Sequence, residues 1–175
     1  MREYRYRVDA EGRVFHDGSE VLDPSTLRFF VRAMQRTPDG RWLVVCQGER
    51  NWFEAEETPL VVQRVHPLDG TAGATGLELR LAGDHREPLD PSTLEVVRGR
   101  LGCRVRRGAL PARFGRVALQ QLAPCLVEEG GALALVVGGA RHPIRERDPA
   151  WRPLAPPDLG TARARTVRPD APAPR

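Results

Sequence analysis

The stretch Arg41–Pro59, RWLVVCQGERNWFEAEETP, decides how the rest of the chain is interpreted. The run of large apolar and β-branched residues over 41–47 predicts a strand. Residues 48–51, Gly-Glu-Arg-Asn, predict a tight turn, and a second strand is expected to open at Trp52. This predicted hairpin places the densest group of polar side chains of the chain beside its largest aromatic residues.

The segment before this hairpin gives the strongest helix signal. Residues 22–36 read LDPSTLRFFVRAMQR, with Asp23 placed as the N-cap and Pro24 as the first helical residue. The apolar side chains then recur at i, i+3, i+4 and i+7 and form one stripe, namely Leu27, Phe30, Val31 and Met34. A second helix is predicted to begin at Pro111 and to end before Pro124.

Alternating apolar and polar residues predict strands through most of the remaining chain. They cover residues 4–8, 13–16, 60–66, 77–81 and 101–107, with a closing hairpin over 132–144. The hexapeptide LDPSTL recurs at 89–94, where it predicts a single helical turn before a strand. We therefore expect an α+β fold, predominantly β, in which two helices pack on bent antiparallel sheets.

Two closely joined halves are expected within this fold. Residues 1–66 form the first, a strand-helix-strand half, and residues 77–147 form the second, a strand-rich half with one helix. Between them lies a loop of small residues and glycine. Residues 148–175 are rich in Pro, Ala and Arg and nearly lack bulky apolar residues, so we predict that this tail is disordered.

Composition excludes several kinds of chemistry. All 27 basic residues are Arg, so a Schiff-base lysine and a P-loop lysine are both ruled out. Residues 1–150 hold 22 Arg against 21 acidic residues, a net charge of +1, and residues 151–175 carry the other +3 of the total of +4. A nearly neutral body is weak support for a nucleic-acid-binding protein.

The patterns of cysteine, histidine and apolar residues narrow the remaining classes of function. The three cysteines are far apart without a CxxC motif, and the four histidines show no ligand spacing, so we predict reduced thiols, no metal site and no cofactor. The sequence shows no long apolar run and no signal or transit peptide. We expect a soluble, cytoplasmic protein without a membrane partner.

Several segments together resemble a known family. They are REYRYRVDAEGRVFHDG at 2–18, LRFFVRAMQRTPDGRW at 27–42, Cys46-x-x-Glu49-Arg50-Asn51-Trp52, and EETPLVV at 56–62. This set is similar to uncharacterised protein family 0598, catalogued as domain of unknown function 4505, over residues 2–145. The chain departs from that pattern after Gly99-Arg100, where Leu101-Gly102-Cys103 replaces the Tyr-His-Pro that eukaryotic members show. A weaker similarity to the bacterial domain of unknown function 1285 implies a small, strand-rich α+β architecture, and neither family implies a reaction.

The predicted turn supplies the first candidate site, formed by Glu49, Arg50, Asn51, Trp52 and Arg41. The guanidinium of Arg50 is suited to grip a carboxylate or phosphate with two hydrogen bonds, while Asn51 orients that group and Trp52 stacks on an apolar part. The alternative is a purely structural hairpin, with Asn51 at positive φ and Glu49 paired to Arg50 or Arg41.

A run of arginines without acidic residues supplies the second candidate, a basic patch. Its members are Arg98, Arg100, Arg104, Arg106, Arg107, Arg113 and Arg116. Such a run is suited to a nucleic-acid backbone or an acidic protein. It is equally the composition of a solvated face that the acidic residues 54–57 neutralise, and no aromatic residue is interleaved for base stacking.

Three functions remain open from the sequence. The leading hypothesis is a non-enzymatic module that binds a small ligand, for example an anionic one, or a protein partner at the predicted turn. The second is electrostatic binding of nucleic acid or an acidic protein through the arginine run. The third is a small hydrolase or transferase of unknown substrate, for which no residue is assigned a catalytic role.

Overall fold

The computed structural model describes residues 2–68 and 75–147. Strands dominate this part of the chain, and two α-helices pack against several sheets, so the predicted α+β, predominantly β fold is confirmed. The predicted disordered tail, 148–175, and most of the predicted linker lie outside the described residues. No helix among the described residues is long and apolar enough to cross a bilayer.

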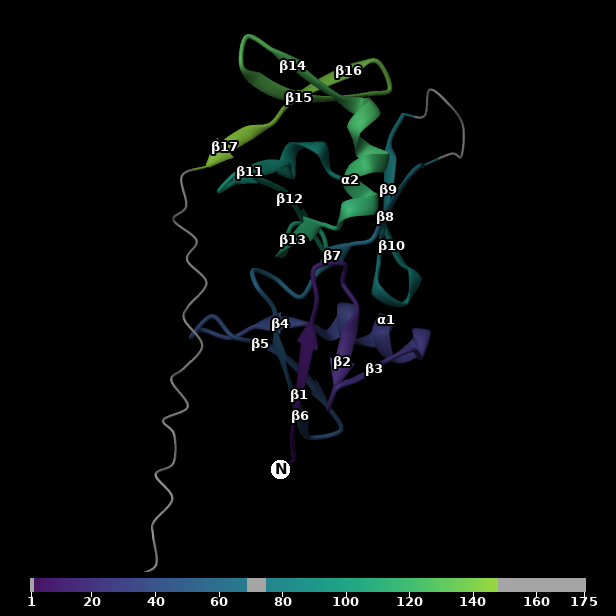
Figure 1. Cartoon of the computed structure of the whole chain (residues 1–175), viewed down its shortest axis with the longest axis vertical. Coiled ribbons are helices and arrows are strands. Elements are labelled where there is room, and N and C mark those ends of the chain that lie inside the picture. The colour runs from purple at the N-terminus through teal and green to yellow at the C-terminus, as the bar shows by residue number, and fades with distance from the viewer. Residues whose placement is uncertain (1, 69–74, 148–175) are drawn as a thin grey trace, which may run out of the picture.

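The N-terminal residues form a six-stranded sheet with the order β3-β2-β1-β6-β5-β4 (Figure 1). Its strands are β1 (Glu3–Val8), β2 (Val14–His16), β3 (Ser19–Glu20), β4 (Gln35–Arg36), β5 (Trp42–Cys46) and β6 (Glu49–Glu54). Neighbouring strands are antiparallel except β1 and β6, which run parallel at the centre of the sheet. The predicted hairpins of residues 4–16 and 41–54 are therefore joined side by side.

Helix α1 (Pro24–Ala33) begins as predicted. The Asp23 carboxylate accepts a hydrogen bond from Thr26 N at 2.7 Å, which satisfies one of the free amides of the first turn. The predicted apolar stripe faces the sheet, where the Phe30 ring lies edge-on to Phe53 with 5.0 Å between centroids. Burial of this stripe fixes α1 across β1 and β6.

The C-terminal residues form three further sheets, with the orders β10-β9-β8, β17-β11-β12-β13-β7 and β14-β15-β16. The first two contain β7 (Val61–Val62), β8 (Arg64–Pro67), β9 (Leu77–Leu81), β10 (His85–Pro88), β11 (Glu95–Val97), β12 (Arg100–Val105), β13 (Leu110–Phe114) and β17 (Arg145–Arg147). The third contains β14 (Leu126–Glu129), β15 (Ala132–Val137) and β16 (Ala140–Pro143). Short 3₁₀ turns occur at η1 (Ala82–Asp84), η2 (Pro91–Thr93) and η3 (Ala123–Cys125). The second LDPSTL copy forms η2 and leads into β11, as predicted.

The predicted start of the second helix is wrong. Residues Leu110–Phe114 form β13, and α2 spans only Arg116–Leu122. Pro111 favours the first turn of a helix, but β13 pairs with both β12 and β7 and buries Ala112 and Phe114. Tertiary pairing therefore overrides the local signal, and the helix starts only after Gly115.

Strand pairing joins the two predicted halves. Strands β7 and β8 come from the predicted first half, yet they pair with β13 and β9 of the second. Residue Gly83 in η1 also lies directly against α1, because a Cβ there would be 2.4 Å from the carbonyl oxygen of Pro24. The division at residues 66 and 77 stays a prediction.

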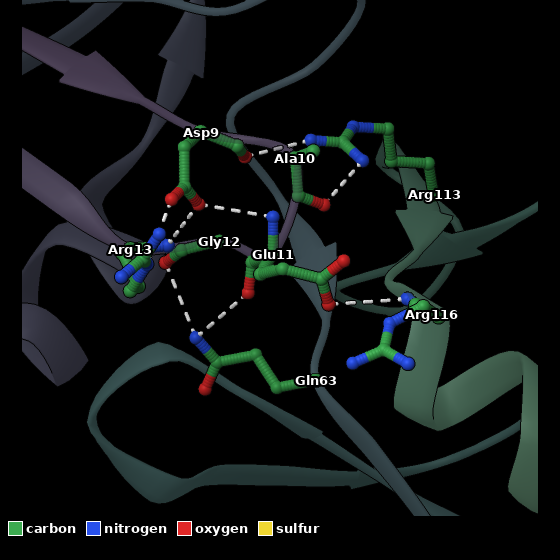
Figure 2. A network of polar contacts seen from close by, with 8 residues as sticks. All are labelled: Asp9, Ala10, Glu11, Gly12, Arg13, Gln63, Arg113 and Arg116. Carbon is green, nitrogen blue, oxygen red and sulfur yellow. Dashed lines mark hydrogen bonds and ion pairs between the residues drawn. The ribbon is translucent and has the colours of Figure 1, made fainter.

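The tip of the β1–β2 hairpin lies between Arg113 of β13 and Gln63, the residue that separates β7 from β8 (Figure 2). Arg113 from β13, only 9% exposed, donates from Nη1 to Ala10 O at 2.7 Å and from Nη2 to Asp9 O at 2.8 Å. Two further carbonyls of the tip accept hydrogen bonds from Gln63 Nε2, those of Gly12 at 3.2 Å and Glu11 at 3.3 Å. Hydrogen bonds to backbone thus tie the six-stranded sheet to the C-terminal strands.

Candidate functional site

The turn between β5 and β6 is shorter than predicted. Cys46 pairs with Glu49, so Gln47 and Gly48 alone form the loop, with φ of +50° and +81°. Positive φ at both central residues matches the type I′ turn, which suits the twist of a two-residue hairpin. The polar residues 49–51, predicted to form the turn, lie inside strand β6 instead.

Strand geometry separates the side chains of the first candidate site. Glu49 and Asn51 point to the face covered by α1, whereas Arg50 and Trp52 point to the opposite face. Arg50 Nη1 lies 3.5 Å from Glu3 Oε1 on the neighbouring strand. The five predicted residues therefore do not converge on one ligand.

The opposite face carries its own contacts. Arg41 Cζ lies 4.1 Å from the centroid of the Trp52 ring, and Arg41 Nε lies 2.5 Å from Asp39 Oδ2. Arg41 thus covers the aromatic face that was predicted to stack on a ligand. The predicted structural alternative also differs from what is found, because Asn51 has an ordinary strand backbone and Glu49 pairs with neither arginine.

Glu49 and Asn51 instead line a hollow of about 320 Å³ between α1 and the sheet, which we call the α1 hollow. Its walls come from β1, α1, β5 and β6, and the lining residues are Tyr6, Ser25, Thr26, Phe29, Phe30, Cys46, Glu49 and Asn51. Two of these residues, Glu49 and Asn51, belong to the site predicted from the sequence. Phe29 could also have been predicted, since this aromatic residue lies off the apolar stripe of α1 and is 39% exposed.

The polar groups of the α1 hollow are held in defined positions. Asn51 is 5% exposed, and its Nδ2 donates to Val44 O at 3.1 Å across the hairpin. The Tyr4 hydroxyl donates to Glu49 Oε1 at 3.5 Å, a long hydrogen bond that leaves most of the acceptor capacity of this carboxylate free. Glu49 is the single charged side chain among the lining residues.

Aromatic rings form the inner wall of the same hollow. Tyr6 stacks on His16 with 4.8 Å between ring centroids and on Phe53 with 5.0 Å. Burial, together with the charges of Tyr4 and Glu49, raises the pKa of Tyr6, so its phenol stays protonated at neutral pH. The hollow therefore combines a neutral aromatic wall with one carboxylate.

The arginine run does not form one patch. Arg100 pairs with Glu56 at 3.1 Å and with Glu57 at 3.2 Å, so part of the run is neutralised by the acidic edge. Arg104 donates from Nε to Gly108 O at 2.6 Å within its own hairpin. These side chains are already engaged with protein groups.

The remaining arginines of the run are dispersed over several elements. Arg106 donates from Nη1 to Met34 O beyond the end of α1, and Arg113 is buried at the hairpin tip. Arg98, Arg107 and Arg116 are exposed. Arg98 and Arg107 lie in the turns at opposite ends of β12, so they face no common ligand.

Metal ligation finds no support in the described part of the chain. Across residues 2–68 and 75–147, no group of three or more His, Cys, Asp or Glu side chains is placed to hold a metal ion. Cys103 is buried, and burial raises the pKa of its thiol.

Comparison with known proteins shows likeness at the level of fold. A DUF1285 family protein from Silicibacter pomeroyi DSS-3 matches with a TM-score of 0.56 and 20% sequence identity, over 81% of this chain and 81% of that one. A DUF1285 family protein from Shewanella baltica OS155 matches with a TM-score of 0.52 and 14% identity, over 68% of this chain and 90% of that one. No family model and no curated relative matches the sequence.

These comparisons bear on the two resemblances. The similarity in fold agrees with the weaker one, to domain of unknown function 1285, and at such low identity it establishes the fold alone. The resemblance to family 0598 is not confirmed. Function must therefore be argued from the geometry of this chain.

Proposed function

We propose that this protein is a non-enzymatic binding module whose α1 hollow holds a small ligand with a cationic group on an apolar body. An arginine or lysine side chain of a partner protein has the same chemistry and suits the same place. The observation that carries the proposal is the position of Glu49. Its carboxylate faces a hollow that no basic side chain lines among the described residues.

Charge selects the ligand class. A carboxylate without a cationic partner in a half-buried hollow attracts an amine or guanidinium more strongly than one in open water, because the local dielectric constant is lower. Such a contact is a charge-assisted hydrogen bond, which is about twice as strong as a neutral one. An anionic ligand would instead meet repulsion from Glu49. The α1 hollow therefore supports a cationic ligand in place of the anionic one suggested for the predicted turn.

Aromatic surface and size define the rest of the ligand. Phe29 lines the hollow with a ring that is 39% exposed, and a cation placed over the face of such a ring gains roughly 0.5–2 kcal/mol. The volume of about 320 Å³ lies at the lower end of the range of small-molecule sites. A compact amine with one ring or a short alkyl chain fits this description.

The hydroxyl groups at the rim favour binding over nucleophilic catalysis. Ser25 and Thr26 donate to Asp23 Oδ2 at 2.7 Å and 2.6 Å, so their protons complete the helix cap. A nucleophilic hydroxyl needs a base placed to remove its proton. The carboxylate that accepts these hydrogen bonds is Asp23, the exposed helix cap, on the solvent side of the first turn. We therefore assign the two hydroxyl groups to the cap and not to catalysis.

The test uses arginine, agmatine and phenethylamine as probes, titrated at fixed ionic strength and followed by amide chemical shifts and calorimetry. We expect at least one probe to bind saturably, with shifts concentrated around the α1 hollow. Glu49→Gln keeps the size of the side chain and removes its charge, so the affinity should fall about tenfold or more. Phe29→Ala, which removes the exposed ring, should also weaken binding.

The matched control is Glu54→Gln. Glu54 lies on the same strand but points to the opposite face, where its carboxylate is 3.9 Å from Arg5. Binding should be unchanged in this variant. Absence of saturable binding by all three probes, or an equal loss in Glu54→Gln and Glu49→Gln, would refute the proposal.

A further inference from the structure

A second hollow, of about 550 Å³, lies where the β1–β2 hairpin tip meets the C-terminal strands. Four of its lining residues are arginines from four different segments: Arg13 beside the tip, Arg64 in β8, Arg80 in β9 and Arg116 at the start of α2. Figure 2 shows Arg13, Gln63 and Arg116 around the tip. We call this site the arginine hollow, and it is independent of the α1 hollow.

Positive charge exceeds negative charge in the arginine hollow. Its lining holds four guanidinium groups but only two carboxylates, those of Glu11 and Asp84. The excess persists when the partners of these residues are included. Asp9 and Glu78 add two negative charges, while Arg28 and Arg86, which contact η1, add two positive ones. The hollow therefore carries a net charge of about +2 in its immediate surroundings.

Two of the four arginines are fixed in place by ion pairs. Arg13 Nε lies 2.7 Å from Asp9 Oδ2. Arg80 contacts two carboxylates, with Nε 3.1 Å from Glu78 Oε1 and Nη1 3.7 Å from Asp84 Oδ1. Each contact uses part of a guanidinium that has five N–H groups, so other donors remain for a ligand. These ion pairs reduce the conformational entropy that the two side chains lose when a ligand binds.

The other two arginines have no carboxylate partner among the described residues. Arg64 donates from Nη1 to the neighbouring carbonyl of Gln63 at 2.8 Å. At Arg116 the backbone N–H, not the side chain, donates to Glu11 Oε2 at 3.1 Å. Their guanidinium groups are therefore available to an anion that enters the hollow.

We propose that the arginine hollow binds a small organic molecule that carries a phosphate or carboxylate group. The planar guanidinium group can donate two parallel hydrogen bonds to two oxygens of either anion. The volume suits a molecule larger than a bare ion, within the range of sites for small ligands. A nucleic-acid strand fits less well, because no aromatic residue lines the hollow to stack on bases.

The test titrates the full chain with inorganic phosphate, pyrophosphate and citrate at constant ionic strength. The two phosphates and the tricarboxylate separate a preference for phosphate from one for carboxylate. We expect saturable binding of at least one probe by calorimetry. Arg116→Gln and Arg64→Gln, both at exposed positions, should each weaken it about tenfold or more without loss of fold by circular dichroism.

The matched controls are Arg98→Gln and Arg107→Gln, which remove the same charge from exposed turns outside the hollow. These variants should bind like the wild type. Three outcomes would overturn the proposal: no saturable binding of any probe, equal weakening by the control substitutions, or binding of an RNA oligonucleotide that Arg116→Gln and Arg64→Gln leave unchanged.

Discussion

Arg113→Met tests how the hairpin tip is joined to the C-terminal strands. Methionine replaces the aliphatic part of the buried Arg113 side chain with an unbranched apolar chain and lacks the guanidinium. Two charge-assisted hydrogen bonds, of 2.7 Å to Ala10 O and 2.8 Å to Asp9 O, are lost. Because a hydrogen bond from a charged group contributes about 1.5–3 kcal/mol, the gross loss is about 3–6 kcal/mol.

Two features reduce this figure. The Asp9 carbonyl also accepts from Gly12 N at 3.1 Å, so only Ala10 O is left without a described donor. Methionine also removes the cost of burying a guanidinium, including its Nε, which is buried without a hydrogen-bond partner among the described residues. We therefore expect the free energy of unfolding to fall by about 2–4 kcal/mol.

Urea denaturation followed by far-UV circular dichroism measures this change directly. The midpoint should fall in Arg113→Met, whereas Arg32→Ala, an exposed arginine on α1, should change stability by less than about 0.5 kcal/mol. Gln63→Ala loosens the same tip, so the double variant should lose less than the sum of the two single losses. A stability of Arg113→Met within 0.5 kcal/mol of the wild type, on the scale of an ordinary surface change, would refute this account of the junction.

Two further predictions concern α1. Gly83→Ala should destabilise the protein by about 3 kcal/mol or more, because its Cβ would lie 2.4 Å from Pro24 O at a φ of +68°. Gly48→Ala, with a φ of +81° and open space around the new Cβ, should cost only about 1–2 kcal/mol; equal costs in thermal unfolding would contradict the close packing of η1 on α1. Hydrogen bonds from the side chains of Thr26 and, to a smaller extent, Ser25 lower the pKa of the Asp23 cap to about 2. The unfolded-state pKa is higher, near 4, so the cap stabilises the fold fully above about pH 5, and the gap in melting temperature between wild type and Asp23→Ala should shrink as pH falls toward 2. Asp23→Asn caps without titrating, so its advantage over Asp23→Ala should not depend on pH.

The fold class could be predicted because local signals and tertiary structure agree over most of the chain. The cap at Asp23 and the stripe containing Phe30 and Val31 define α1 without knowledge of its partners. The second helix was misplaced where the two disagree. Pro111 is a helix-start residue by local preference, but β12 and β7 flank it in space, and strand pairing is a non-local contact that a single sequence does not reveal.

The candidate site was only half predicted, and the reason is the length of one turn. A loop of two residues instead of four moves residues 49–51 into a strand, where adjacent side chains must point to opposite faces. The neighbours Glu49 and Arg50 therefore lie on opposite faces of the sheet. Glu49 instead shares the α1 hollow with Tyr6 and Phe29, which lie more than 19 positions away along the chain.

The arginines show the same effect of chain folding. The arginine run does not form one patch, and the arginine hollow cannot be predicted from the sequence. In the run, residues that are neighbours along the chain lie on two strands, two turns and a helix, and the guanidinium groups of Arg100 and Arg104 bind carboxylates and carbonyls nearby. In the hollow, consecutive arginines are 16 to 51 positions apart. Arg64 and Arg80 are register partners across β8 and β9, and Arg13 joins them because the hairpin tip docks on Gln63 and Arg113. If that docking creates the hollow, Arg113→Met should weaken anion binding as well as stability, although Arg113 does not line the site. Phosphate or citrate affinity that survives in folded Arg113→Met would show that the arginines are placed by their own strands and not by the junction.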